Sequence, residues 1–193
     1  YDSATSVSRT FTINKASQTI SFTSPGDQTY STNTISLTFS ATSGLTPTVT
    51  SSTTGVCTVS GTTLTLVSSG SCVLTAAQAG SDTYSAGTSV VNTITVSKAT
   101  PTVSSMSDET KTYGDASFTP TAPTVTYQSA SVGGAITYSS SSTSVASVNS
   151  STGAVTVAGA GSATITATFT PTDTGKFNTA TTTYAVSVAK STQ

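Results

Sequence analysis

An internal repeat constrains the fold of this sequence more than any other feature. Residues 1–20 align without a gap on residues 84–103, and Tyr, Thr, Ser, Val, Lys and Ala recur in register. A weaker third copy closes the sequence. Lys15, Lys98 and Lys190 mark the same point of each copy and lie 83 and 92 residues apart. A period of that length predicts two tandem domains, each able to form one modest core.

The repeat also predicts the domain boundaries. We expect residues 1–14 to be the last strand of a preceding repeat, residues 15–97 and 98–189 to be two domains, and residues 190–193 to begin a following repeat. The strand at residues 1–14 then has two explanations. It is a piece of a longer repetitive chain, or it is a donor strand that completes a sandwich in a neighbouring molecule and so builds a filament.

Composition favours a folded, all-β chain. Leu, Ile, Val and Phe make up only 35 of 193 residues, but the net charge of −1 is far too small for a charge-driven disordered chain. Apolar and polar residues alternate in segments such as 63–67 and 163–169. Ser and Thr supply 84 residues, and Thr suits a pleated surface. A mucin-like glycosylated stalk is the compositional alternative, but such stalks lack this alternation.

Short alternating segments bounded by Gly, Ser, Asn and Pro predict about seven strands in each domain. The predicted strands are 18–23, 36–42, 48–52, 56–59, 63–67, 71–78 and 89–96, then 100–106, 123–128, 135–140, 144–148, 154–158, 162–170 and 182–188. This spacing predicts two tandem immunoglobulin-like antiparallel β-sandwiches. Residues 24–33 are rich in turn residues, and residues 106–122 predict a long loop or an additional edge strand.

A family resemblance rests on the hairpin of the second domain. Residues 144–168, SVASVNSSTGAVTVAGAGSATITAT, resemble the bacterial immunoglobulin-like domains of group two, and residues 55–77 are similar. The segment KTYGDASF at residues 111–118 resembles a motif of repeats in large bacterial surface proteins. The resemblance covers the whole chain and implies tandem spacers of an adhesin, wall or phage decoration, or binding tips. Both domains lack the buried Trp and inter-sheet disulfide of antibody domains, so antibody-like recognition is not implied.

The polar residues give little support for catalysis. The sequence contains no His, which excludes Ser-His-Asp and Cys-His catalysis and any His-ligated metal. Glu109 and Asp108 lie in a predicted loop with Asp115 nearby, and a glycosidase pair would need an aromatic cleft, for which Tyr127 and Tyr138 are the candidates. A solvated acidic turn explains these residues more simply. We therefore expect no enzyme activity, no catalytic residues and no cofactor.

Calcium binding and an isopeptide bond are two further alternatives. The carboxylates lack Asp-x-Asp spacing, although Asp82 could meet Asp108 or Glu109 at the domain junction. The acids considered for calcium are Asp27, Asp82, Asp108, Asp115 and Asp173. A Lys could form an isopeptide bond beside Glu109, but a loop position argues against it. We expect no metal site.

Cys57 and Cys72 are the one covalent feature that we predict, as a disulfide. Their equivalents in the second domain are Ala146 and Ala163, small residues in a similar frame. Free buried thiols are the alternative. A disulfide would place the protein in an oxidising compartment, hence outside the cell or on its surface. A loop of this length is stabilised by about 3 kcal/mol in the chain-entropy estimate.

The favoured function is mechanical, as two links of a longer array on a bacterial surface whose partners are neighbouring repeats of the same chain. Six basic side chains scattered over two domains argue against nucleic acid, and the sequence has no transmembrane run. A second hypothesis is a binding module in which Tyr30, Tyr84, Tyr113 and Tyr138 hold a glycan or a host protein. The third is a filament subunit that exchanges strands with other copies.

Overall fold

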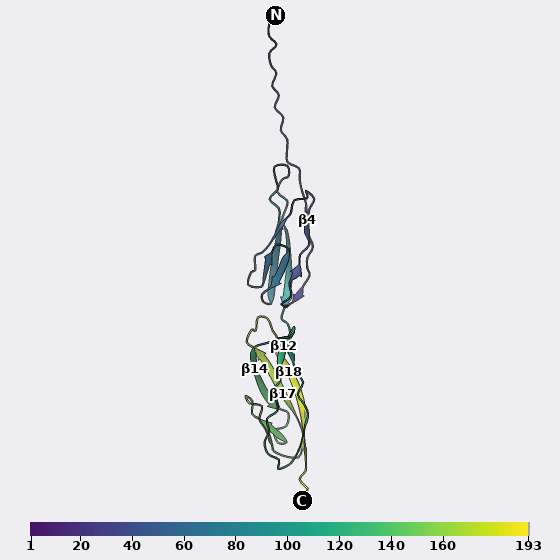
Figure 1. Ribbon diagram of the computed structural model, residues 1–193, viewed down its shortest axis with the longest axis vertical. Helices are drawn as coiled ribbons and strands as arrows, with labels where there is room; N and C mark the ends of the chain where they lie inside the picture. Colours follow the sequence, from purple (N-terminus) through teal and green to yellow (C-terminus); the bar gives the residue numbers. More distant parts are fainter. Residues whose placement is uncertain (193) are drawn as a thin grey trace. The chain divides into compact units, whose positions relative to one another are not determined.

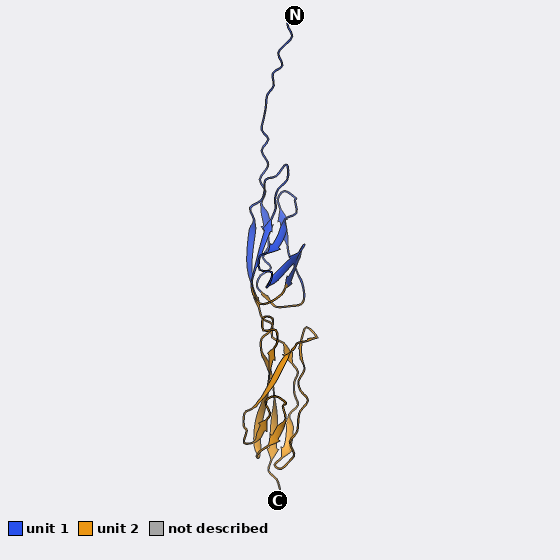
Figure 2. Cartoon of the chain, turned by 90° about the vertical axis from the view of Figure 1, so that its left-hand side faces the viewer, with its two compact units in different colours: residues 1–27, 33–65, 71–95 blue, residues 28–32, 66–70, 96–193 orange. Residues whose placement is uncertain are grey.

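The computed structural model describes residues 1–192, whose regular secondary structure consists of β-strands (Figure 1). The chain divides into two compact units (Figure 2). Unit 1 comprises residues 1–27, 33–65 and 71–95, and unit 2 comprises residues 28–32, 66–70 and 96–193. Two short segments of the first repeat therefore belong to unit 2. The boundaries at residues 15–97 and 98–189 stay a prediction.

The first nine strands of the chain are short and form three small sheets, and most of their residues belong to unit 1. The strands are β1 (Ile20–Phe22), β2 (Gln28–Thr29), β3 (Ile35–Ser36), β4 (Phe39–Ala41), β5 (Thr48–Ser51), β6 (Cys57–Ser60), β7 (Thr63–Leu66), β8 (Gly70–Ala77) and β9 (Val90–Ser97). The sheet orders are β2-β9-β8-β5, β3-β7-β6 and β1-β4. Strand β2, the last residue of β7, the first residue of β8 and the end of β9 belong to unit 2.

Unit 2 repeats this plan with longer strands. They are β10 (Thr102–Val103), β11 (Glu109–Thr112), β12 (Val125–Tyr127), β13 (Ala130–Ser131), β14 (Gly134–Ser140), β15 (Ala146–Val148), β16 (Val155–Val157), β17 (Gly161–Pro171) and β18 (Ala180–Ala189). The largest sheet has the order β11-β18-β17-β14, beside the smaller sheets β10-β12-β13 and β15-β16.

The core of unit 2 follows from the alternation of Thr with apolar residues. Every second residue of β17 from Ala163 to Pro171 is buried, and the threonines between them face outward or lie half-buried. Ile165 is fully buried and Phe169 is 2% exposed. Burying one such side chain stabilises the fold by about 1.5–3 kcal/mol. A chain with few large apolar residues thus forms a core because it puts nearly all of them on one face.

The fold class is confirmed as two immunoglobulin-like β-sandwiches, with one feature that the sequence did not predict. In each repeat a short edge strand pairs in parallel with the last strand of that repeat, as β2 with β9 and β11 with β18. Strand β2 lies in the segment predicted to be a connection, and β11 in the segment predicted as a loop or edge strand. Both edge strands are polar and short, so they lack the apolar alternation that marks a strand in sequence.

Candidate functional site

The disulfide joins β6 to β8 in unit 1. Cys57 and Cys72 are both fully buried, and their Cα atoms lie 5.7 Å apart. Their counterparts Ala146 and Ala163 are also buried, at 0% and 2% exposure. The two units therefore share one frame, in which unit 2 places small apolar side chains where unit 1 places a covalent bond.

Three of the acidic side chains accept hydrogen bonds from backbone N–H groups of strands. Asp27 Oδ1 accepts a hydrogen bond from the Thr95 N–H at 2.7 Å, and Asp108 Oδ1 accepts one from the Ala185 N–H at 2.7 Å. Asp115 Oδ2 likewise accepts from a backbone N–H three residues before it, at 2.8 Å. Within residues 1–192, no cluster of three acidic, His or Cys side chains could hold a metal ion.

The structure corrects the prediction for Glu109. This residue begins strand β11 instead of lying in a loop, and its carboxylate is 3.1 Å from the Lys111 ammonium. The same ammonium lies 4.4 Å from the centroid of the Phe118 ring. Glu109 is thus paired with a cation on its own strand.

Three aromatic rings of unit 2 pack together, and we call them the aromatic clasp. Tyr30 follows β2, Tyr127 ends β12, and Phe177 lies in the loop between β17 and β18. The ring centroids are 6.5 Å apart for Tyr30 and Tyr127, 5.5 Å for Tyr30 and Phe177, and 5.4 Å for Tyr127 and Phe177. The Tyr127 hydroxyl also donates to the Tyr30 carbonyl oxygen at 2.6 Å. Such pairs contribute about 0.5–1.5 kcal/mol beyond the area that they bury.

The β12–β13 turn adds a polar contact to the clasp. Gln128 and Ser129 have φ values of 49° and 65°, the left-handed pair that a two-residue hairpin turn needs. The Gln128 Oε1 accepts from the Thr32 N–H at 2.9 Å and from the Thr32 hydroxyl at 2.6 Å. Its Nε2 donates to the Ser31 hydroxyl at 2.8 Å. The side-chain amide of Gln128 therefore matches both donors and acceptors of segment 28–32.

A Lys–Asp ion pair lies beside the clasp. The Lys176 ammonium lies 2.9 Å from Asp173 Oδ2 and 5.7 Å from the centroid of the Tyr30 ring. The hydrogen bond between the two side chains holds the pKa of Asp173 below its ordinary value and raises that of Lys176. Both side chains are a third to a half exposed, so solvent screens the pair and its contribution to stability is small.

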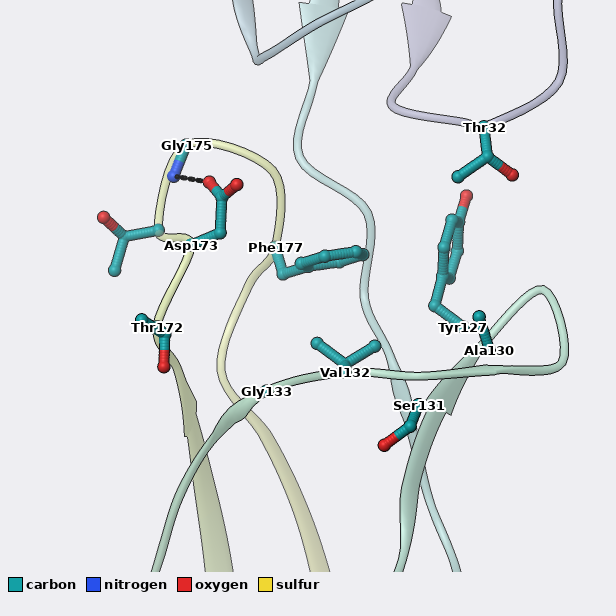
Figure 3. Close-up of a pocket in the computed structure, with 11 residues that line it drawn as sticks. Thr32, Tyr127, Ala130, Ser131, Val132, Gly133, Thr172, Asp173, Gly175 and Phe177 are labelled. Carbon is teal, nitrogen blue, oxygen red and sulfur yellow. Dashed lines mark hydrogen bonds between the residues drawn. The ribbon is translucent and has the colours of Figure 1, made fainter.

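A pocket of about 670 Å³ opens beside the clasp in unit 2. Figure 3 shows Phe177 and Val132 between Asp173 on one side and Tyr127 with Thr32 on the other. Apolar side chains thus form its middle, and hydroxyl and carboxylate groups stand at its edges. Small-molecule sites combine these two features, with polar groups that fix the orientation of a ligand on an apolar surface.

The four tyrosines named in the binding-module hypothesis differ in their exposure. Tyr30 and Tyr138 are buried, at 7% and 8% exposure, so the prediction is wrong for both. Tyr138 belongs to the core of unit 2, Tyr84 is partly buried, and Tyr113 remains 52% exposed. Sequence reasoning missed Phe177, although its alignment with Tyr84 in the repeat was a signal for it.

Residues 1–14 are exposed and carry no strand, and their large apolar side chains face solvent. These side chains are Tyr1, Val7, Phe11 and Ile13. The hypothesis that this segment donates a strand to another molecule stays a prediction. Within the part of the chain that the structure describes, no helix is long and apolar enough to cross a membrane.

The fold is that of a pair of immunoglobulin-like repeats, and comparisons with known proteins found the following similarities. The family model for the immunoglobulin-like domain of intimin matches residues 124–170. No curated protein matches the chain.

Similar solved structures include Drosophila N-cadherin EC1-3, with 11% identity, a TM-score of 0.35, and coverage of 92% of this chain and 69% of that one. The surface layer protein SbsC, domains 1-6, matches with 19% identity and a TM-score of 0.36, over 93% of this chain and 29% of that one. Mouse cadherin-23 EC22-24 matches with 16% identity and a TM-score of 0.34, over 90% and 65%.

Proposed function

We propose that this chain is a pair of spacer units from a tandem array on the outside of a bacterial cell, where the units transmit tension between a surface and a distal domain. The observation that carries the proposal is the parallel pairing of an early edge strand with the last strand of each repeat. In unit 2, Glu109 to Thr112 of β11 lie opposite Val186 to Ala189 of β18. The N–H of Tyr113 extends this pairing with a 2.8 Å bond to the Ala189 carbonyl oxygen.

Parallel pairing suits a unit that is pulled from its two ends. Because both strands run in the same direction, the chain comes in at one end of the pair and leaves at the other. A pull on the chain then slides the two strands along each other, so that their hydrogen bonds must break together. Strand β2 repeats the arrangement on a smaller scale, with Gln28 opposite Val96 and a bond from the Tyr30 N–H to the Ser97 carbonyl oxygen.

Export is part of the proposal. The Cys57–Cys72 disulfide is suited to an oxidising compartment. The similarity of residues 124–170 to the immunoglobulin-like domain of intimin also supports export. The chain has only 13 charged side chains, and Ser and Thr cover the strand faces instead. A surface of this kind is hydrated without strong charge, so it neither attracts nor repels charged polymers at a cell boundary.

A second candidate function is glycan binding in the pocket beside the clasp. The observation in its favour is a pocket of about 670 Å³ with Phe177 and Tyr127 at its walls, since the apolar faces of sugar rings stack on aromatic side chains. The Asp173 carboxylate and the Thr172 hydroxyl would then contact sugar hydroxyls.

Binding arrays separate the two candidates. The spacer proposal predicts that the full chain shows no saturable binding to bacterial or host glycans, and that Thr172→Trp, which fills the pocket from an exposed position, changes nothing. Saturable binding of a glycan by the chain, lost in Thr172→Trp and kept in the matched variant Thr121→Trp on another exposed loop, would replace the spacer proposal with the binding module.

A further inference from the structure

Two faces of unit 2 are built from equivalent residues of the repeat. The first face is formed by Tyr30, the segment Val67–Ser69, and Lys98 with Ala99. The second is formed by Tyr113, Ala158–Ala160, and Lys190 with Ser191. We call them the covered face and the open face.

The equivalence of the two faces is geometric as well as sequential. Tyr30 and Tyr113 each follow an edge strand and donate their N–H to the last strand, to Ser97 and Ala189, at 2.8 Å in both cases. In each face, the segment before a long strand is followed by a glycine with positive φ that begins this strand. These glycines are Gly70 and Gly161, with φ values of 139° and 140°.

The covered face is occupied by other segments of unit 2. The other two rings of the aromatic clasp, Tyr127 and Phe177, pack on Tyr30, and the Ser69 N–H donates to the Gly175 carbonyl oxygen at 2.9 Å. Ala99 forms a parallel bridge with Phe177, in which the Ala99 N–H donates to the Lys176 carbonyl oxygen at 2.9 Å. These contacts leave Tyr30 only 7% exposed.

The same bridge occurs in unit 1 between Ala16 and Tyr84. The Ala16 N–H donates to the Thr83 carbonyl oxygen at 2.9 Å, and the Ser85 N–H donates back to Ala16 at 2.8 Å. In both units the Ala that follows the repeated Lys forms a parallel bridge with an aromatic residue, Tyr84 or Phe177, in the loop before the last strand. This contact is a fixed element of the repeat and does not depend on the side chains of one unit.

The open face has the same groups without these partners. Tyr113 is 52% exposed, and a cavity of about 480 Å³ is lined by Tyr113, Ala158, Gly159, Ala160, Lys190 and Ser191. Within residues 1–192, the Ala160 N–H, which corresponds to that of Ser69, makes no hydrogen bond, and Ser191 has no bridge partner. Asp115 stands where the covered face has Thr32, so this face adds a carboxylate.

We propose that the open face is a docking surface for a further immunoglobulin-like unit of the kind of unit 2. That partner presents an aromatic residue in the loop before its last strand to Ser191, a Tyr–Gln hairpin turn to Tyr113, and a Lys to the Asp115 carboxylate. The proposal rests on the spacer function and names the partner of each unit in such an array. The carbonyl oxygen of the partner's loop glycine accepts the Ala160 N–H, as that of Gly175 accepts Ser69.

An extended chain tests the proposal with the partner surface that the protein itself supplies. Residues 1–191 are followed by a second copy of residues 100–193, which keeps the spacing after Lys190 equal to that after Lys98. Nitration of Tyr113 by tetranitromethane, measured on peptides by mass spectrometry, should slow about sevenfold relative to the original chain if its exposed fraction falls from 52% to the 7% of Tyr30. The Ala160 N–H should gain protection from hydrogen exchange.

Variants make the result specific. Phe177→Ala in the added copy alone should return Tyr113 to its original reactivity, whereas Thr121→Ala in the added copy should not. Equal reactivity of Tyr113 in the original and extended chains would overturn the proposal. Protection of Tyr113 in the original chain that rises with concentration would also overturn it, because the occupant would then be a second molecule. Glycan binding through the pocket would contradict the spacer function and leave the Tyr113 result unchanged. Failure of the spacer function is therefore distinguishable from failure of the docking proposal.

Discussion

Removal of the disulfide should destabilise unit 1 by about 3 kcal/mol and leave unit 2 unchanged. The perturbation is Cys57→Ala with Cys72→Ala, for which Ala146 and Ala163 show that the frame accepts Ala at both positions. The sequence separation of 15 residues between the cysteines gives about 3 kcal/mol of loop-closure entropy in the unfolded chain. A domain of this size shifts in melting temperature by about 4–8 °C per kcal/mol, so a fall of roughly 12–24 °C is expected.

The assay is thermal and denaturant unfolding of the full chain, with hydrogen exchange to assign each transition to a unit. Reduction of the native protein should reproduce the effect of the double variant, and peptide mapping without reductant should find Cys57 joined to Cys72. A loss of less than 1 kcal/mol, or an equal shift in both units, would refute the reasoning. Two free thiols in protein from its native compartment would refute the disulfide itself.

Two further predictions concern unit 2. Among residues 1–192 the Tyr184 hydroxyl has no hydrogen-bond partner, and burial, with Glu109 and Tyr138 nearby, raises the pKa of Tyr184 to about 12. Because the unfolded chain releases this proton near pH 10, the stability of the unit should fall as pH rises from 10 to 12, and Tyr184→Phe should flatten that fall. In denaturant titrations at pH 7 the same variant should stabilise the unit by up to about 1 kcal/mol. A loss of stability in Tyr184→Phe would contradict this. Gly134→Ala should cost about 1–3 kcal/mol because the new Cβ would lie 2.4 Å from the Phe169 ring and from the Thr170 carbonyl oxygen, whereas Gly133→Ala, with open space around it, is the control that should stay near neutral in the same titrations.

The core and the long strands could be predicted from sequence because they depend on one local pattern. In β17, alternation of apolar residues with Thr defines both the strand and its buried face. The repeat alignment likewise pairs Cys57 with Ala146, and both are fully buried. Periodicity and internal homology therefore carry most of the fold class.

The clasp could not be predicted because its parts come from three distant segments. Tyr30 follows a strand of two residues, and Tyr127 and Phe177 lie 97 and 147 residues further along the chain. The burial of Tyr30 depends on which segments meet it, and Tyr113, with the same local sequence pattern, stays exposed. The edge strands β2 and β11 were missed or left ambiguous for a related reason, since a polar strand is recognised by its partner and not by its own pattern.

Single-molecule pulling of the full chain tests the central claim, that the units are built to resist tension along the chain. Unit 2 should unfold at a higher force when it is pulled from the chain ends than when it is pulled through handles at Ser131 and Thr172. These handles flank the paired residues Gly134 and Pro171 and would peel β14 from β17.

The disulfide identifies the event from unit 1. Fifteen residues at about 3.6 Å each span about 54 Å when extended. The bridge already holds the two Cα atoms 5.7 Å apart, so reduction should add about 48 Å to the contour released by unit 1 and nothing to that of unit 2. Equal unfolding forces for unit 2 in the two pulling directions would contradict the account.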